Sequence, residues 1–302
     1  MIERTVRPLL PVDLGLTLGP MCRGRSDPTM RIEPSGVWRA TRTPDGPVTT
    51  HIRARAGEGT VTMSAWGPGA AWAVEAFPRL VGADDAEDGF LAGAGVVGDL
   101  HRRLPGLRIG RSAAVVEALV PSILEQKVVG LEAKRSWAGL VRHLGEPAPG
   151  PGAGRLRVAP EPAVLAATPS WVFHRFGVER KRADTIRRAC SYARRLEETV
   201  TMTPEDARRR LTALPGIGPW TAAEVGLVAL GDADAVSVGD YHLPNQVAWA
   251  LAGEPRADDA RMLELLEPWP GHRGRVIRLI THGAGAAPRF GPRMPLRSIA
   301  GI

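Results

Sequence analysis

The 302-residue sequence has only two cysteines, Cys22 and Cys190. Two thiols exclude a four-cysteine iron–sulfur cluster or zinc site built from this chain, and they give no disulfide framework, so we expect reduced thiols. Long apolar runs are also missing, because Gly, Pro or charge interrupts each one well before the roughly 18 residues of a membrane span. The N-terminal segment has acidic residues and prolines where a signal peptide has an apolar run. We therefore expect a soluble, cytoplasmic protein with no membrane partner.

Lysine is scarce as well. Lys127, Lys134 and Lys181 are the only three, so arginine supplies most of the 39 basic side chains, which exceed the 32 acidic ones by 7. Residues 1–95 hold 10 basic and 11 acidic side chains, whereas residues 96–302 hold 29 and 21. The second part of the chain is thus the one suited to a polyanion, with a well-solvated arginine-rich surface as the alternative.

The apolar pattern changes along the chain. The first 65 residues alternate or are β-branched, with turn sequences between the stretches. From Arg111 onward the period is about 3.6 residues, which indicates helices. We expect strands over 29–34, 37–43, 48–56 and 59–66. We expect helices over 69–82, 111–145 with a break near Pro121, 179–198, 203–214, 219–230, 241–251, 257–267 and 272–283.

These patterns predict an α+β protein. A β-rich N-terminal domain, an antiparallel sheet with a helix, is expected over residues 1–95. An all-α core is expected over residues 96–285. The basic tail over 286–302 is broken by prolines, so we expect an extended arm there.

One short segment suggests a binding site. In LPGIGPWTA, which begins at Leu214, one helix is expected to end before Pro215, and Pro219 suits the first position of the next helix. Gly216 and Gly218 permit a tight hairpin between them. The first amides of a helix lack helical partners and lie at its positive dipole end, so they can hold a nucleic-acid phosphate. A plain connector between two packed helices is the alternative.

The hairpin and Asp240, 22 residues after Gly218, resemble the signature of the HhH-GPD superfamily of DNA glycosylases. The similar group is the bacterial 3-methyladenine DNA glycosylase II enzymes, which pair a β-rich N-terminal domain with a helical core. The resemblance covers roughly residues 110–283 by motif. It implies double-stranded DNA as the partner, a role in base excision repair near the nucleoid, and a monomer. The residues expected to contact DNA are Pro215, Gly216, Ile217, Gly218, Thr221 and Lys127.

Asp240 is the expected catalytic residue. Cleavage of an N-glycosidic bond builds oxocarbenium-like positive charge on the sugar, which a fixed carboxylate stabilises while it orients a water molecule. An N-cap for the following helix is the simpler role for this aspartate. In bifunctional members of the superfamily a lysine of the second hairpin helix attacks the sugar, and here that place is taken by Trp220. We therefore expect a monofunctional hydrolase without lyase activity.

The resemblance also implies a base pocket. Its expected residues are Trp220, Glu224, Tyr241 and Gln126. Glu224 stands where the similar enzymes have a tyrosine; it could attract a cationic purine, hydrogen-bond a base edge or be a solvated helix residue. Lys127 stands where they have an apolar wedge that fills the gap left by a flipped base, and Val128 takes over if the register differs.

The expected function is excision of a damaged, foremost an alkylated, purine by base flipping and hydrolysis. The same fold acting on deaminated or bulky bases is one alternative, and a non-catalytic DNA-binding protein is the other. No metal and no cofactor are expected, apart from a monovalent cation that the resemblance allows at the hairpin carbonyls.

Overall fold

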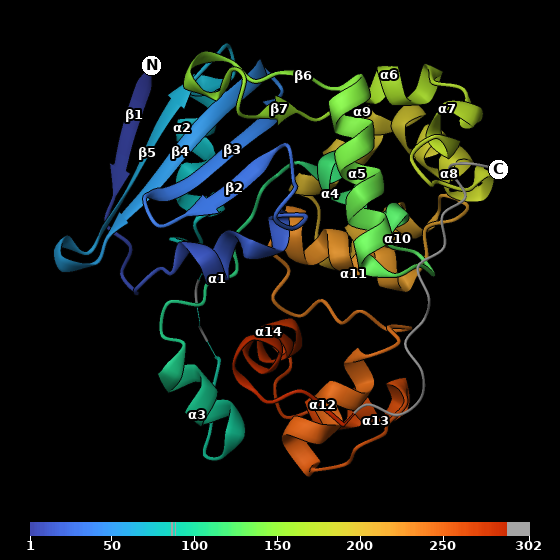
Figure 1. Cartoon of the computed structure of the whole chain (residues 1–302). Helices are drawn as coiled ribbons and strands as arrows, with labels where there is room; N and C mark the ends of the chain where they lie inside the picture. Colours follow the sequence, from blue (N-terminus) through green and yellow to red (C-terminus); the bar gives the residue numbers. More distant parts are fainter. Residues whose placement is uncertain (86, 88, 289–302) are drawn as a thin grey trace.

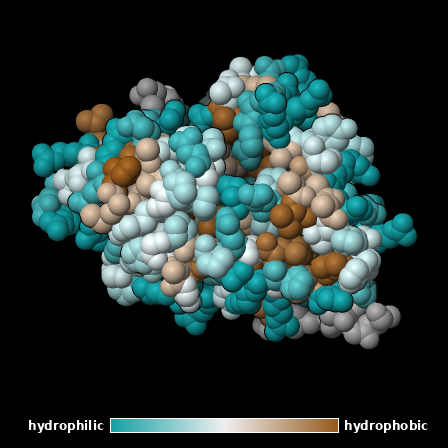
Figure 2. Space-filling model, turned by 90° about the horizontal axis from the view of Figure 1, so that it is seen from above, coloured by the Kyte–Doolittle hydropathy of each residue, from teal (hydrophilic) through white to brown (hydrophobic). Residues whose placement is uncertain are grey.

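A computed structural model describes residues 1–85, 87 and 89–288 of the chain. Figure 1 shows an N-terminal sheet, a large group of helices beside it and a smaller group below. The tail expected over 286–302 lies outside the described residues from 289 onward. Figure 2 shows that hydrophilic residues cover most of the face seen from above, with smaller apolar areas between them.

The N-terminal sheet is antiparallel throughout, in the order β1-β5-β4-β3-β2. Val37, Ile52 and Met63 lie opposite one another on three neighbouring strands, and their side chains pack against Phe77 of the covering helix, α2. The four predicted strands and this helix are confirmed. The elements are β1 (Ile2–Val6), β2 (Met30–Glu33), β3 (Gly36–Thr43), β4 (Gly46–Arg55), β5 (Thr60–Trp66), α1 (Leu14–Leu18) and α2 (Ala70–Leu80).

The first group of helices shares one apolar core, which contains Leu119, Trp137, Phe173 and Ile217. A two-stranded ribbon, β6 (Glu146–Pro147) and β7 (Arg157–Val158), joins this group to the outer face of the sheet. The helices are α4 (Val115–Leu124), α5 (Gly130–Leu144), α6 (Pro162–Ala167), α7 (Ser170–His174), α8 (Arg180–Ser191), α9 (Ala193–Glu197), α10 (Pro204–Thr212) and α11 (Pro219–Val225).

The second group has its own core, which combines residues on both sides of the first group in sequence. Leu100 and Leu107 pack there with Val247, Met262 and Val276. No helix of the described residues is long and apolar enough to cross a membrane. The helices are α3 (Val96–Arg103), α12 (Leu243–Ala252), α13 (Asp259–Leu266) and α14 (Arg273–Gly283).

The helix break expected near Pro121 is wrong in position. α4 runs through Pro121 to Leu124, and the turn follows over residues 125–129. A proline inside a helix loses one backbone hydrogen bond, but Leu119 and Ile123 are fully buried on either side of it, so packing retains the helix. The long helix expected over 179–198 is also interrupted, at Tyr192 between α8 and α9.

Candidate active site

The predicted hairpin connects α10 to α11 and packs on the core of the first helix group. Ile217 is buried in the core of the first helix group, and its amide donates to the carbonyl of Leu214 at 3.1 Å. Gly216 has a φ of +95°, a conformation that favours glycine. Pro215 and Gly216 are exposed, so the backbone of the hairpin is accessible to a ligand.

A second loop supports the hairpin. Nε2 of Gln126 donates to the carbonyl of Gly216 at 3.0 Å and to Oγ1 of Thr221 at 2.9 Å. Thr221 is 2% exposed, so its hydroxyl stabilises the hairpin from inside, and its expected contact with DNA stays a prediction. Gln126 thus holds the hairpin, and its expected role in a base pocket stays a prediction. Arg188 of α8 donates to the carbonyl of Pro215 at 3.0 Å.

Lys127 projects from the turn that follows Gln126. It is exposed and has a φ of +55°, which only a few non-glycine residues adopt. Such strain persists where the surrounding structure imposes it, and the Gln126 side chain fixes the neighbouring residue against the hairpin. The loop therefore presents Lys127 beside the hairpin, as a DNA-contacting residue would require. A cation at the hairpin, which stays a prediction, would have to share the carbonyls of Pro215 and Gly216 with side-chain donors.

Asp240 is held by three donors at the start of α12. Its Oδ1 accepts from the amides of His242 at 2.8 Å and Leu243 at 2.9 Å, and its Oδ2 accepts from Nε1 of Trp220 at 3.0 Å. The N-cap residue of α12 is His242, so Asp240 instead caps the turn that leads into the helix, and the indole of the second hairpin helix fixes the other oxygen. The carboxylate is partly exposed, so it combines a fixed orientation with access to a ligand.

Glu224 lies one helical turn after Trp220 in α11. Oγ of Ser237 donates to Oε1 of Glu224 at 2.5 Å, and the amide of Asp240 donates to the carbonyl of Ser237 at 3.2 Å. Burial raises the pKa of Glu224 above its ordinary value; Glu125 and Asp240 act in the same direction, against the Ser237 hydrogen bond and Arg23. Glu224 is therefore not a fully solvated helix residue, which excludes one of its three expected roles.

No protein-family model and no curated protein matches the sequence. Among solved structures, the chain is similar to a 3-methyladenine DNA glycosylase from Archaeoglobus fulgidus, with a TM-score of 0.79 and 19% identity over 92% of this chain and 98% of that one. The chain has the fold of the HhH-GPD DNA glycosylases. An 8-oxoguanine glycosylase/lyase from Clostridium acetobutylicum gives a TM-score of 0.71, with 12% identity over 93% of this chain and 96% of that one.

A third solved structure of this fold, a 3-methyladenine DNA glycosylase of Schizosaccharomyces pombe, is a complex with abasic DNA. It has a TM-score of 0.51 and 17% identity over 66% of this chain and 97% of that one. The resemblance inferred from the hairpin and Asp240 is therefore confirmed as a likeness of fold.

Two arginines act on Glu224 from other parts of the chain, and sequence reasoning missed both. Nη1 of Arg23 lies 3.6 Å from Oε1 of Glu125, directly before the Gln126 loop. Arg278 of α14 is 6% exposed and donates to the carbonyl of Leu16; burial lowers its pKa to about 10. Both arginines act electrostatically on Glu224. They come from segments far from the hairpin in sequence, so no local motif indicates them.

The aromatic residues of the expected pocket differ in their setting. Trp220 is partly buried against Asp240, whereas Tyr241 is 83% exposed with its ring edge-on to His242 at 4.8 Å between centroids. A pocket role for Tyr241 stays a prediction. Of these two rings, Trp220 is therefore the one that is fixed at the carboxylate, through its indole N–H.

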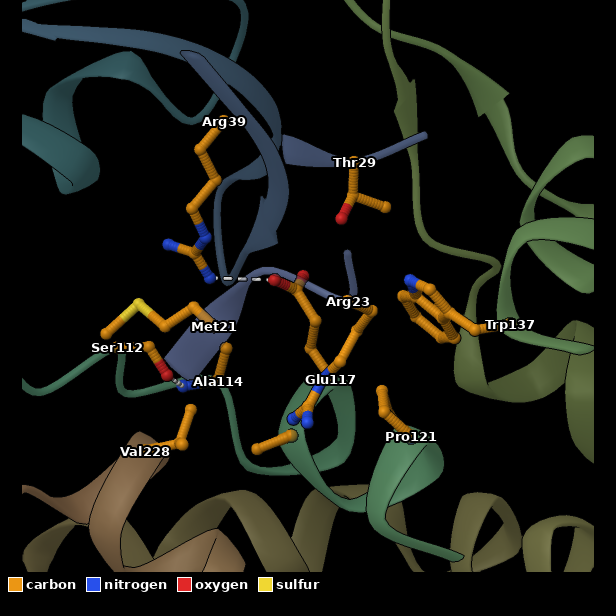
Figure 3. A pocket seen from close by; sticks show the side chains of 11 residues that line it. Met21, Arg23, Thr29, Arg39, Ser112, Ala114, Glu117, Pro121, Trp137 and Val228 are labelled. Carbon is orange, nitrogen blue, oxygen red and sulfur yellow. Dashed lines mark hydrogen bonds and ion pairs between the residues drawn. The ribbon is translucent and has the colours of Figure 1, made fainter. Parts of the chain in front are cut away.

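A small cavity lies between the sheet and α4 (Figure 3), and Asp240 is not among the residues that line it. Arg39 of β3 contacts Glu117 of α4 across it at 2.7 Å, and Trp137 closes one side. Its volume of about 20 Å³ is enough for about one water molecule. This cavity belongs to the interface between the sheet and the helices, and it cannot hold a base.

The two hairpin glycines give a matched test of this geometry. A Cβ at Gly216 would lie 2.5 Å from Oγ1 of buried Thr185, and its φ is left-handed; a Cβ at Gly218 would meet nothing within 4 Å. We expect Gly216→Ala to lower the free energy of unfolding by about 1–2 kcal/mol. Gly218→Ala should change it by less than about 0.5 kcal/mol. Urea denaturation measures both, and equal losses would contradict the constraint at Gly216.

Proposed function

We propose that the chain is a DNA glycosylase that flips a damaged purine, foremost an alkylated one, out of duplex DNA and hydrolyses its N-glycosidic bond. The observation that carries the proposal is the Asp240 carboxylate, fixed by two amides and the Trp220 indole beside an exposed hairpin. The glycosylase fold supports it. Such an activity belongs to base excision repair at the nucleoid.

In this mechanism the hairpin binds a DNA phosphate, and Asp240 stabilises the positive charge that develops on the sugar. The exposed hairpin backbone and the N-terminus of α11 hold a phosphate, with the exposed guanidinium of Arg188 nearby. A phosphate held there sets the distance of the adjoining sugar from Asp240. As the bond to the base breaks, positive charge grows on the sugar, and a carboxylate already oriented by three donors stabilises it without reorganising.

We also propose that water, not an amine of the protein, attacks the sugar. α11 contains no lysine, and Trp220 donates to Asp240 from the position that a nucleophilic lysine would need. The three lysines lie in the turn after α4, in α5 and in α8. An alkylated purine that already carries positive charge is a good leaving group, so hydrolysis of this substrate needs no acid on the protein.

The test is base release from duplexes that carry methylated, deaminated or etheno purines, with and without alkali. We expect release of a methylated purine, and strand cutting only after alkali opens the abasic site, because no imine forms with the protein. Cutting without alkali, or trapping of the protein on DNA by borohydride, would contradict the hydrolase assignment. Binding without release of any base would favour the non-catalytic alternative.

A further inference from the structure

The second carboxyl group near Asp240 is that of Glu224 in α11. Trp220 and Glu224 are four residues apart in α11, so they share one face of the helix. Trp220 bonds to Asp240, and Glu224 bonds to Ser237, whose carbonyl accepts from the amide of Asp240. A base stacked on Trp220 with its sugar at Asp240 would therefore present its far edge towards Glu224.

We propose that Glu224 is a general acid that protonates the leaving base, and that the site thereby accepts neutral purine lesions in addition to cationic ones. The inference rests on the proposed glycosylase function and deepens it. A neutral purine leaves as an anion unless a proton reaches one of its ring nitrogens, whereas a cationic alkylpurine leaves as a neutral base. The two classes thus differ in their need for Glu224.

The charges around Glu224 suit this role. Glu125 and Asp240 are the acidic groups that act on it, and Arg23 and Arg278 are the basic ones. Arg23 is already paired with Glu125, and the proposed mechanism gives Asp240 the anionic role beside the sugar. Where two neighbouring carboxyl groups have unlike environments, one can act as the proton donor while the other acts as the anion. Burial, which raises the pKa of Glu224, favours its protonated form.

The hydrogen bond from Ser237 occupies one carboxyl oxygen of Glu224 and leaves the other for the substrate. Ser237 donates to Oε1, and no hydrogen bond to Oε2 is present among the described residues. In the reaction the C1′–N9 bond breaks and its electron pair moves into the purine. The carboxyl proton passes to a purine ring nitrogen, and the oxygen of water bonds to C1′ and releases its proton to solvent by way of Asp240. Glu224 then recovers its proton from solvent.

The experiment compares Glu224→Gln with the wild type on duplexes that contain hypoxanthine, a neutral base, or 7-methylguanine, a cationic one. Glutamine keeps the acceptor for Ser237 but cannot transfer a proton. Under single-turnover conditions we expect release of hypoxanthine to fall by roughly 10²-fold, while release of 7-methylguanine stays near the wild-type rate. Glu58→Gln, at an exposed ion pair with Arg55 on the sheet, is the matched control and should leave both rates unchanged.

The pH profile provides a readout that a structural role would not change. Hypoxanthine release by the wild type should fall as the pH rises through the raised pKa of Glu224, because the acid form is lost; the variant should lack this limb. A carboxyl group whose pKa is raised in the folded state stabilises the fold at low pH, and this stabilisation is lost as the pH rises through that pKa. Glu224→Gln should therefore unfold at neutral pH no more easily than the wild type.

The outcomes separate the two proposals. Equal slowing of both substrates, or an unchanged pH limb in the variant, would overturn the acid role and leave Glu224 as a support of α11. Release of 7-methylguanine but not of hypoxanthine by the wild type would overturn the inference and keep the glycosylase function. Release of neither base would overturn the glycosylase function itself.

Discussion

Asp240→Asn is expected to slow base release by about 10³-fold while DNA binding and folding are retained. The carboxylate acts on charge that exists only in the transition state, so its neutralisation lowers the rate of bond cleavage far more than affinity. Oδ1 of asparagine can still accept from the amides of His242 and Leu243, whereas its Nδ2 cannot accept from Nε1 of Trp220, so one of the three contacts is lost. The measurement is single-turnover release of 7-methylguanine, with binding to an abasic duplex measured in parallel.

Asp258 gives the matched control for this variant. It is the N-cap of α13, and its Oδ1 accepts from the amide of Arg261 at 2.9 Å, as Oδ1 of Asp240 accepts from Leu243. Asp258→Asn should leave base release unchanged, because it makes the same capping contact without a partner from the hairpin helix. Base release at the wild-type rate by Asp240→Asn would show that Asp240 only caps the turn that leads into α12.

Comparison of these two aspartates shows how much of the site the sequence alone predicts. The spacing from Gly218 to Asp240 and the hairpin residues were sufficient to predict the fold, because their roles depend on neighbours close in sequence and on a helix start. The sequence also predicted a capping role and a catalytic role for Asp240, and the two need not exclude each other. The structure shows that the capping contact and the contact with Trp220 use different oxygens, so they are compatible.

The sequence is less informative about residues whose partners are distant along the chain. The sequence did not predict the contacts of Gln126 with Gly216 and Thr221, about 90 residues later in the chain, and its expected contact with a base stays a prediction. Pro121 was taken as a helix break, because a local rule does not include the burial of its neighbours. The short helices α6 and α7, of six and five residues, have too few turns to show a period of 3.6.

The acidic turn before α3 makes a buried ion pair with a residue that is far away in the sequence. Asp85 accepts from Nη2 and Nη1 of Arg275 at 2.6 and 2.9 Å, and from the amide of Ile109 at 2.9 Å. The side chains of Arg275 and Asp85 are only 1% and 7% exposed. The only other ion pair of Arg275 among the described residues is with Glu87, at 3.5 Å, and Glu87 also pairs with Arg108. This carboxylate therefore holds α14 to the segment that leads into the helical core.

Asp85→Asn is expected to lower the free energy of unfolding by about 3 kcal/mol, because it leaves a buried guanidinium without its main counter-charge. For a domain of this size that corresponds to a fall in the thermal midpoint of roughly 6–12 °C. Asp99→Asn removes an ion pair to Arg102 whose side chains are 60% and 68% exposed, so its loss should be below about 1 kcal/mol. Thermal unfolding of both variants measures the difference. Similar small losses would mean that water reaches Arg275 when Asp85 is neutral, and that the apolar core around Val276 alone holds α14 in place.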